Sequence, residues 1–251
     1  MKLNKNQIEI FSRQIILKNV GSIGQKKIFE TKVLIVGMGG LGCPAAEFLT
    51  RAGVGTLGIL DNDKVELSNI HRQSLYNSKD LKKFKVSIAK TKLKNINLKT
   101  KINSYKLRLN KKNCIKILQK YDYVIDGSDN FETKFLINDT CLKLKKFLVT
   151  GAISKFDGHI FTFDFKKREV PCLRCFYQEE TIEEDTLNCE YEGVIGTVAG
   201  IIGTIQANEI LKYIIGIGKN LNGCILVLDL LNLNFRKIKI KKNKRCFCIS
   251  V

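Results

Sequence analysis

Apolar and polar positions alternate in blocks along the first 151 residues. Short apolar runs have the length of buried strands, and segments with helical spacing separate them. The predicted strands are residues 33–36, 56–60, 123–125 and 147–150. The predicted helices are residues 6–18 and 23–29 before the first strand, and then 44–51, 81–93, 113–119 and 132–144. Strands that alternate with helices predict an α/β fold with a Rossmann-like, doubly wound, mostly parallel sheet.

The pattern changes after Gly151. Residues 158–165, 223–230 and 234–240 alternate as strands, which predicts an antiparallel extension of the sheet in the C-terminal half. Residues 193–207 are apolar but broken by Gly, Thr and Gln, which indicates a buried helix and not a membrane span. No linker is evident, so we expect a single domain over residues 1–251. Its parts would be N-terminal helices (1–30), a nucleotide-binding half (31–151) and a second half (152–251).

A glycine-rich turn joins the first predicted strand to the helix that follows it. Residues 32–49 read KVLIVGMGGLGCPAAEFL, in which Gly37, Gly39, Gly40 and Gly42 match the pattern G-x-G-x-x-G. Glycines let a ligand approach the backbone, and the unpaired amides of a helix N-terminus attract anions. Asp61 follows the second strand, where an acidic residue holds a ribose hydroxyl. The motif suits NAD, FAD or ATP, and the alternative is a tight turn with no ligand.

Charged residues that follow the second and third of these strands favour ATP. Arg72 and Lys85 come after the second strand, and Asp126 and Asp129 come directly after residues 123–125. In open α/β sheets, ligands bind beyond the carboxyl ends of the strands, so these side chains would meet in one crevice. Cations neutralise phosphate oxygens and a carboxylate takes Mg²⁺, whereas hydride transfer would need an apolar nicotinamide pocket.

Composition narrows the class of protein. The chain has 43 basic and 24 acidic residues and a net charge of +19, but its lysines are spread along the whole length. No basic module interleaved with aromatic residues is visible, so we expect neither a nucleic-acid partner nor a membrane partner. The polar N-terminus has no apolar segment typical of a signal peptide, which predicts a cytoplasmic protein. Nine cysteines in such a chain indicate metal or thiol chemistry rather than disulfides.

Several longer motifs together resemble those of the MoeB/ThiF/HesA family, the bacterial relatives of ubiquitin-activating enzymes. The resemblance covers nearly the whole chain. Its motifs are SRQIIL, VLIVGMGGLG, LDNDKVELSNIHRQ, GSDN, PCLRCF, NCEYEGV and a late cysteine pair. The family resemblance implies adenylation of the C-terminal Gly-Gly carboxylate of a small ubiquitin-like sulfur carrier, with release of pyrophosphate. The carrier would be MoaD-like, for molybdopterin synthesis, or ThiS-like, for thiamine synthesis, and the sulfur donor would be a separate protein.

The resemblance also implies a role for individual residues. Those placed at the nucleotide are Gly37, Gly39, Gly40, Gly42, Asp61, Asp63, Asn69, Arg72, Lys85, Ser128, Asp129 and Asn130. Asn69 and Arg72 would grip the phosphates, and Lys85 would stabilise charge near the α-phosphate. Asp129 would bind Mg²⁺. Arg13 would reach across from the second subunit of a homodimer.

Two cysteine pairs form a candidate zinc site. Cys172 and Cys175 make a Cys-x-x-Cys pair, and Cys246 and Cys248 make a Cys-Phe-Cys pair near the C-terminus. Four thiolates suit tetrahedral Zn²⁺, and the resembling family has such a site, although its second pair usually has the wider Cys-x-x-Cys spacing. The alternative is buried or free thiols. Cys189 is a candidate nucleophile for sulfur transfer, with an inert thiol as the alternative.

Two other functions remain open from the residues alone. One is a nicotinamide-dependent oxidoreductase, which the combination of Arg72, Lys85 and Asp129 disfavours. The other is a non-catalytic protein that only binds the carrier, and the presence of every candidate ATP-binding residue argues against it.

Overall fold

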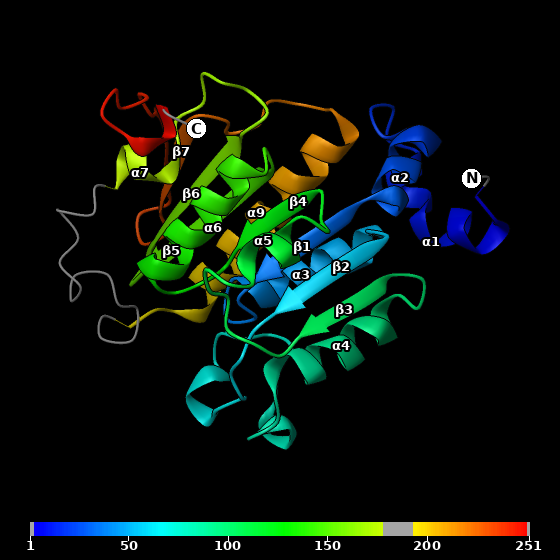
Figure 1. Cartoon of the computed structure of the whole chain (residues 1–251). Helices are drawn as coiled ribbons and strands as arrows, with labels where there is room; N and C mark the ends of the chain where they lie inside the picture. Colours follow the sequence, from blue (N-terminus) through cyan, green and yellow to red (C-terminus); the bar gives the residue numbers. More distant parts are fainter. Residues whose placement is uncertain (1–2, 178–192, 250–251) are drawn as a thin grey trace.

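The computed structural model describes residues 3–177 and 193–249, which form one mixed sheet with helices on both faces (Figure 1). The strand order is β3-β2-β1-β4-β5-β6-β7-β8. The strands are β1 (Lys32–Val36), β2 (Thr56–Leu60), β3 (Lys101–Tyr105), β4 (Tyr123–Asp126), β5 (Phe147–Ser154), β6 (Asp157–Asp164), β7 (Cys224–Asp229) and β8 (Asn234–Lys239). Strands β1 to β5 pair in parallel, and β6, β7 and β8 extend the sheet antiparallel. The predicted fold class is therefore confirmed.

Helices cover the two faces of the sheet. Their bounds are α1 (Lys5–Ile15), α2 (Gly21–Glu30), α3 (Gly42–Ala52), α4 (Lys85–Ile96), α5 (Cys114–Leu118), α6 (Phe131–Lys143), α7 (Leu173–Phe176) and α9 (Gly196–Ile215). Short 3-10 turns in the described residues include η1 (Leu67–Asn69), η2 (Ser78–Asp80) and η4 (Phe247–Ile249). No helix in the described part of the chain combines the length and the apolar character that a membrane crossing needs.

Strand β1 shows why the sheet is covered on both sides. Val33 and Ile35 point to one face and pack with α3, α4 and α9, whereas Leu34 and Val36 point to the other face and pack with α5 and α6. Successive side chains of a strand alternate between the faces, so an apolar run with no polar residue needs a layer on each side. Figure 1 shows α5 and α6 in front of the sheet and α3 and α9 behind it.

The strand order reverses between β1 and β4. From β1 the chain moves outward to β2 and β3, and then returns to pair β4 with the other edge of β1. The connections at the carboxyl ends of β1 and β4 therefore diverge and open a crevice, which is where ligands bind in folds of this kind.

Helix α1 packs at the opposite ends of these strands. The ring of Phe11 lies edge-on to Phe29 with ring centroids 5.1 Å apart, and both rings approach Gly53, just before β2. Because β2 has five residues, its carboxyl end lies roughly 16 Å further along the strand. The N-terminal helices therefore lie at the far end of the sheet from the crevice.

Two of the differences between the structure and the predicted elements bear on the sheet and the site. Strand β3 was not predicted, because its sequence KINSY is largely polar and only Ile102 is fully buried at this edge of the sheet. Helix α4 begins at Lys85 and not at Leu81, because Lys82 has a φ of 64° and Phe84 is extended, so these residues cannot continue a helix. The second change matters for function, since it places Lys85 at the first position of a helix.

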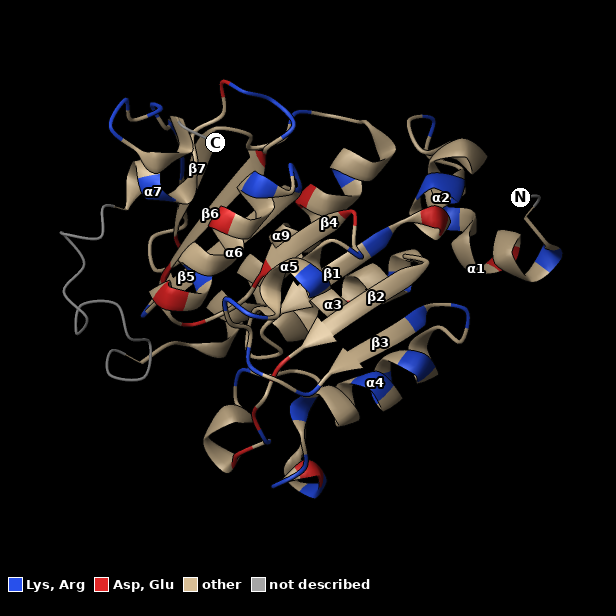
Figure 2. Cartoon of the chain, viewed as in Figure 1, with Lys and Arg blue, Asp and Glu red and all other residues tan. Residues whose placement is uncertain are grey.

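Basic residues lie on many elements. Figure 2 shows Lys and Arg on α2, α4 and α7, which are well separated in the molecule. The net charge of +19 is therefore not confined to one element.

Candidate active site

A cavity occupies the crevice at the carboxyl ends of β1, β2 and β4. Most of the predicted nucleotide-binding residues line it, and they come from the loops that follow these strands. The predicted residues in its wall are Gly37, Gly39, Gly40, Asp61, Asp63, Arg72, Lys85, Ser128, Asp129 and Asn130. The cavity continues past Ala152 and His159 to Tyr177 and Val194, so it extends beyond the glycine turn.

The glycine turn is so tight that side chains could not replace two of its glycines. Gly37 has a φ of +89°, and a Cβ atom there would lie 2.6 Å from the carbonyl oxygen of Gly127. A Cβ atom at Gly42 would lie 1.9 Å from the carbonyl oxygen of Gly37. Gly42 does not line the cavity, so its role is to let α3 start against the turn, whereas Gly39 and Gly40 face the ligand space.

Asp61 links the glycine turn to the end of β2. Its carboxylate accepts hydrogen bonds from the backbone N–H of Met38 at 2.8 Å and of Asp63 at 2.7 Å. Burial raises the pKa of Asp61 above its ordinary value, while Lys85 and these two N–H groups oppose that shift. The carboxylate therefore orders both loops and lies in the cavity wall, where a ribose hydroxyl could reach it.

Lys85 is a buried cation at the first position of α4. Its ammonium donates a hydrogen bond to Asp63 at 2.9 Å, and only 6% of the residue is exposed. Burial lowers the pKa of Lys85, but Asp61, Asp63 and Asp129 together outweigh burial, so the pKa lies above its ordinary value. The cavity therefore holds a fixed positive charge, which suits phosphate oxygens.

The turn between β4 and α6 carries the predicted metal ligand. Asp129 is exposed at the cavity, and its carboxylate accepts a hydrogen bond from the side chain of Asn130 at 3.0 Å. Asn130 caps α6 by accepting a hydrogen bond from Thr133 N–H at 2.9 Å. An exposed carboxylate beside a phosphate site fits Mg²⁺, which binds through one or two carboxylates and keeps several waters.

Three other cavity residues were not predicted. Arg108 follows β3 and forms an exposed ion pair with Glu132 at 3.2 Å. Gln73 is 4% exposed, and its amide oxygen has no hydrogen-bond partner among the residues that the structure describes. Lys134, on α6, is buried against Asp126 with an N–O distance of 3.2 Å. No local pattern separates Lys134 from the exposed lysines of the chain, because its burial depends on the fold.

Besides Gly42, two residues predicted at the nucleotide do not line the cavity of their own chain. Asn69 is 8% exposed and ends the 3-10 turn η1, where its backbone carbonyl accepts from Arg72 N–H at 3.2 Å. The Arg72 guanidinium donates to the Ser68 carbonyl at 2.8 Å, which directs it along the same loop. Arg13 is exposed on α1, which packs at the amino ends of the strands, so it lies far from this cavity.

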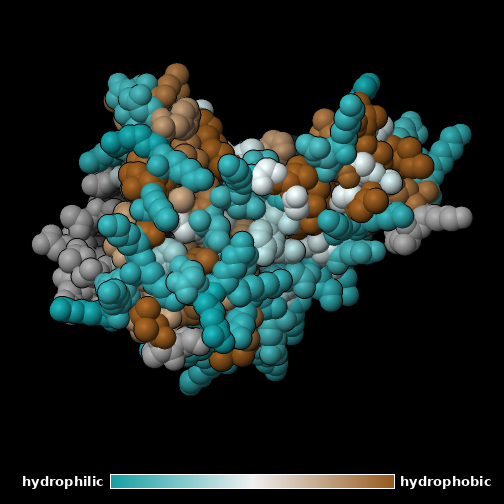
Figure 3. Space-filling model, turned by 90° about the horizontal axis from the view of Figure 1, so that it is seen from above, coloured by the Kyte–Doolittle hydropathy of each residue, from teal (hydrophilic) through white to brown (hydrophobic). Residues whose placement is uncertain are grey.

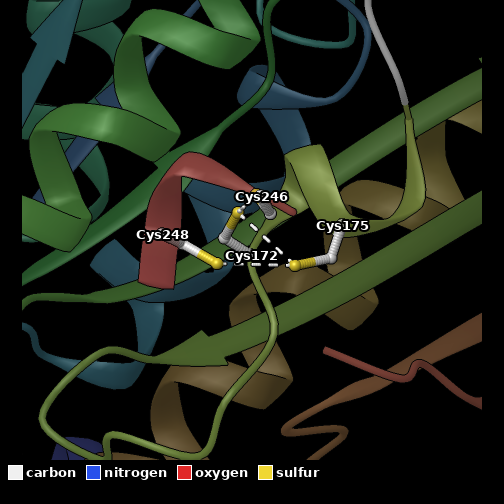
Figure 4. Close-up of side chains that lie close together, drawn as sticks. All are labelled: Cys172, Cys175, Cys246 and Cys248. Carbon is white, nitrogen blue, oxygen red and sulfur yellow. Dashed lines mark hydrogen bonds between the residues drawn. The ribbon is translucent and has the colours of Figure 1, made fainter. Parts of the chain in front are cut away.

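The two cysteine pairs meet in one cluster (Figure 4). Cys172 and Cys175 flank the start of α7, and Cys246 and Cys248 come from the C-terminal segment. Sulfur atoms of neighbouring cysteines lie 3.5 to 3.9 Å apart. Tetrahedral Zn²⁺ with bonds of about 2.3 Å separates its sulfurs by about 3.8 Å, so the cluster has the right size.

Hydrogen bonding within the cluster shifts the pKa values of Cys172 and Cys175 in opposite directions. A hydrogen bond from the Cys172 thiol lowers the pKa of Cys175 to about 4, and the same hydrogen bond together with burial raises the pKa of Cys172. Without a cation the sulfurs share protons in this way, whereas a bound metal replaces those protons. The Cys-Phe-Cys spacing does not prevent convergence, because the 3-10 turn at Phe247–Ile249 directs Cys248 back to Cys175. Cys189 lies outside the described residues.

A comparison with family models decides the relationship. The ThiF family model matches residues 11–248. The chain belongs to the ThiF family. Because this match spans nearly the whole chain, it includes the glycine turn, the β4–α6 turn and all four clustered cysteines.

Named relatives share about two fifths of its sequence. The chain is 39% identical over 249 residues to a "Sulfur carrier protein adenylyltransferase" of Thermus thermophilus, covering 98% of this chain and 92% of the relative. It is 40% identical to an "Adenylyltransferase and sulfurtransferase MOCS3" of Culex quinquefasciatus, covering 99% of this chain. This ThiF-family chain spans 56% of the length of that MOCS3 protein.

Solved structures confirm the fold. A crystal structure of E. coli MccB with MccA-N7isoASN superposes with a TM-score of 0.85 at 17% identity, covering 97% of this chain and 75% of that one. E. coli MccB with ATP superposes with a TM-score of 0.80 at 15% identity, covering 100% and 83%. At such identities the likeness concerns the fold alone.

Proposed function

We propose that this ThiF-family protein uses ATP to adenylate the C-terminal Gly-Gly carboxylate of a small ubiquitin-like sulfur-carrier protein, releasing pyrophosphate. One observation carries the proposal: the glycine turn, Lys85 and Asp129 face a single cavity at the point where the strand order reverses. The relatives named as adenylyltransferases support it.

The cavity suits attack by a carboxylate on the α-phosphate. Both reactants are negatively charged, so the main task of the protein is to reduce repulsion and hold the groups in line. Lys85 and Arg72 supply fixed positive charge, and Mg²⁺ held by Asp129 would neutralise further charge on the phosphates. The nucleophile is already ionised, so no side chain has to act as a base.

The extension of the cavity toward His159 and Tyr177 would admit the tail of the carrier. An extended Gly-Gly tail has no side chains and fits a narrow channel that ends at the nucleotide. The carrier is MoaD-like or ThiS-like, so molybdopterin and thiamine synthesis both stay open. A separate protein would donate the sulfur.

Arg13 would act on the partner's nucleotide in a homodimer. It lies at the far end of the sheet from its own cavity, so a cation finger from this position requires a second subunit. The N-terminal helices and the turn between them expose apolar side chains, among them Ile10 at 69%, Ile16 at 67% and Ile23 at 71% exposed. Brown patches at the right-hand end of Figure 3, the side where α1 and α2 lie in Figure 1, agree with an interface there.

We also propose that the cysteine cluster holds structural Zn²⁺. The four sulfur atoms lie within 4.8 Å of one another and join α7 to the C-terminal segment. The ion would therefore stabilise the outer part of the sheet, away from the reacting groups.

The test is ATP–pyrophosphate exchange in the presence of candidate carriers. Wild-type protein should catalyse exchange only with a cognate carrier, and mass spectrometry should find the carrier adenylate. Asp129→Ala should lose exchange by several orders of magnitude, since one carboxylate would hold the metal. Asp122→Ala removes an aspartate outside the cavity and should keep normal exchange. Normal exchange in Asp129→Ala would remove that residue from the mechanism.

A second arm of the same experiment separates adenylation from sulfur transfer. A thiol has no part in activating a carboxylate, so Cys189→Ala should keep full exchange. If Cys189 is the nucleophile of the later step, thiocarboxylate formation on the carrier should fall in this variant. An unchanged thiocarboxylate yield would support the inert thiol.

A further inference from the structure

Lys134 is a buried cation that the chemistry above does not use. It lies in α6 with 5% of its surface exposed, and it contributes to the cavity wall. Its ammonium donates to the Asp126 carboxylate at 3.2 Å and to the Gly151 carbonyl at 2.7 Å. Asp126 is fully buried at the end of β4, and Gly151 lies in β5. One side chain therefore ties α6 to two neighbouring strands.

The Asp126 carboxylate also holds the turn that bears Asp129. One of its oxygens accepts from the backbone N–H of Ser128 at 2.9 Å and from the Ser128 hydroxyl at 2.5 Å. Its other oxygen faces Lys134. The backbone of Asp126 is also held in place, because the side-chain amide of Gln206 donates to the Asp126 carbonyl at 2.8 Å. Lys134 and Ser128 thus form hydrogen bonds with different oxygens of the same carboxylate.

Electrostatics makes this arrangement sensitive to Lys134. A buried carboxylate without a counter-charge takes up a proton or turns toward water, because burial disfavours the charged form. Asp126 itself is fully buried, but Ser128 and Asp129, which follow it in the chain, line the cavity. Either response would disturb the hydrogen bonds to Ser128 and shift the turn.

We propose that Lys134 is a positioning residue, which through Asp126 and Ser128 holds the Asp129 carboxylate where it meets the metal–nucleotide. This inference rests on the proposed function. Removal of Lys134 should weaken the metal-dependent part of nucleotide binding by about tenfold or more, the usual effect of removing a partner that orients a metal ligand. Binding of metal-free ATP should change little, because Lys134 does not hold the glycine turn.

The experiment measures ATP binding by calorimetry without carrier, once with EDTA and once with Mn²⁺ as the probe metal. The ratio of the two dissociation constants is the metal contribution, and Asp129→Ala defines its absence. The main variant is Lys134→Met, which leaves Asp126 buried without its counter-charge and should lose most of the metal contribution. The second variant is Lys134→Met/Asp126→Asn, in which both buried charges are removed and the asparagine oxygen can still accept from Ser128. Such paired removal commonly preserves stability. We expect this double variant to melt near wild type and to keep much of the metal contribution, because it has no unpaired charge to disturb the turn.

Two further variants control for folding. Lys134→Arg keeps the positive charge and should recover much of the metal contribution that Lys134→Met loses. Lys212→Met leaves the 3%-exposed Glu209 side chain without its ion-pair partner at a place outside the cavity wall. It should lower the melting temperature and leave the metal contribution unchanged.

The outcomes separate this inference from the proposed function. A stably folded Lys134→Met variant with the wild-type metal contribution would show that Lys134 is only structural. If Lys134→Met does not fold, a folded double variant that has lost the metal contribution would overturn the inference, because it carries no unpaired charge that could disturb the turn. A wild-type protein that binds ATP equally with and without Mn²⁺ would also overturn the inference. A wild-type protein that binds no ATP would overturn the proposed function itself.

Discussion

The pKa values of ionisable residues in this protein depend on their burial and on the charges around them. Lys85 and His159 both lie in the cavity wall. Burial lowers the pKa of each, but the net shifts of the two residues are opposite. Three carboxylates compensate the burial of Lys85, so its pKa rises. Burial dominates at His159, and although Asp157 opposes it, the pKa of the imidazole lies below its ordinary value. The wall therefore carries a fixed cation at one end and a neutral ring at the other.

The lowered pKa of His159 predicts a pH dependence of stability. Below about pH 6.5 the unfolded chain binds a proton at this position before the folded chain does. The free energy of unfolding should therefore fall as the pH drops from about 6.5 through the folded pKa. Denaturant unfolding of wild type and His159→Gln at several pH values measures this, because glutamine does not titrate. The wild-type curve should fall more steeply toward acid, and parallel curves would contradict the prediction.

The space around each glycine determines whether a larger residue can replace it in a given turn or helix. The glycine turn packs on the β4–α6 turn and on its own helix, so Gly37 and Gly42 have no room for a methyl group. Helix α9 has similar glycines, but a Cβ atom at Gly200 would meet nothing within 4 Å. The same substitution should therefore have opposite effects in these two elements.

Gly42→Ala and Gly200→Ala form a matched pair. Gly42→Ala forces the turn apart and should destabilise the protein by about 1–3 kcal/mol, with weaker ATP binding. Gly200→Ala should stabilise it by about 0.5–1 kcal/mol, because alanine favours a helix interior more than glycine does. Thermal and denaturant unfolding of both variants provide the measurement. A neutral Gly42→Ala would mean that the turn relaxes at no cost.

The C-terminal segment contributes two of the four clustered cysteines. The purified protein should contain about one Zn²⁺ per chain, and Cys172→Ser should lose the metal and lower the melting temperature. Cys224→Ser, on β7 and outside the cluster, is the control and should keep the metal. Elemental analysis with thermal unfolding decides between these results. Metal-free protein of full stability, purified without chelators, would end the zinc proposal.

The whole molecule places Arg13 and the cavity at opposite ends of the sheet. No rearrangement of one side chain can join them within one subunit, because α1 is packed through Phe11 against Phe29 and the loop at Gly53. A symmetric two-fold dimer would bring Arg13 of one subunit to the nucleotide of the other and create two shared sites.

Mixed dimers test this arrangement. Arg13→Ala and Asp129→Ala should each be nearly inactive. In a mixed dimer one site has both residues intact and the other has neither. Random reassociation makes about half of the dimers mixed, so co-refolding should restore roughly a quarter of wild-type exchange. No recovery, with mixed dimers confirmed by mass, would mean that Arg13 does not act across the interface.

The sequence was sufficient to predict those features whose physical cause lies in neighbouring residues of the chain. The apolar runs of β1 and β2, the glycine turn and Asp61 identified the parallel sheet and the ligand crevice, because strand burial, turn geometry and the place after a strand depend on neighbouring residues. Strand β3 could not be found in this way. Its polar residues lie at a sheet edge, where pairing with β2 and not hydrophobic burial makes the strand.

Tertiary structure decided the contacts between distant segments. The sequence by itself determined the fold class, the residues at the ends of the strands and the presence of two cysteine pairs. Only the fold brought Cys172 within 3.6 Å of Cys246, removed Arg13 from its own cavity and buried Lys134 against Asp126. These outcomes depend on how the sheet orders and orients its strands. No local pattern encodes the counter-charge that a buried carboxylate meets after the chain has folded.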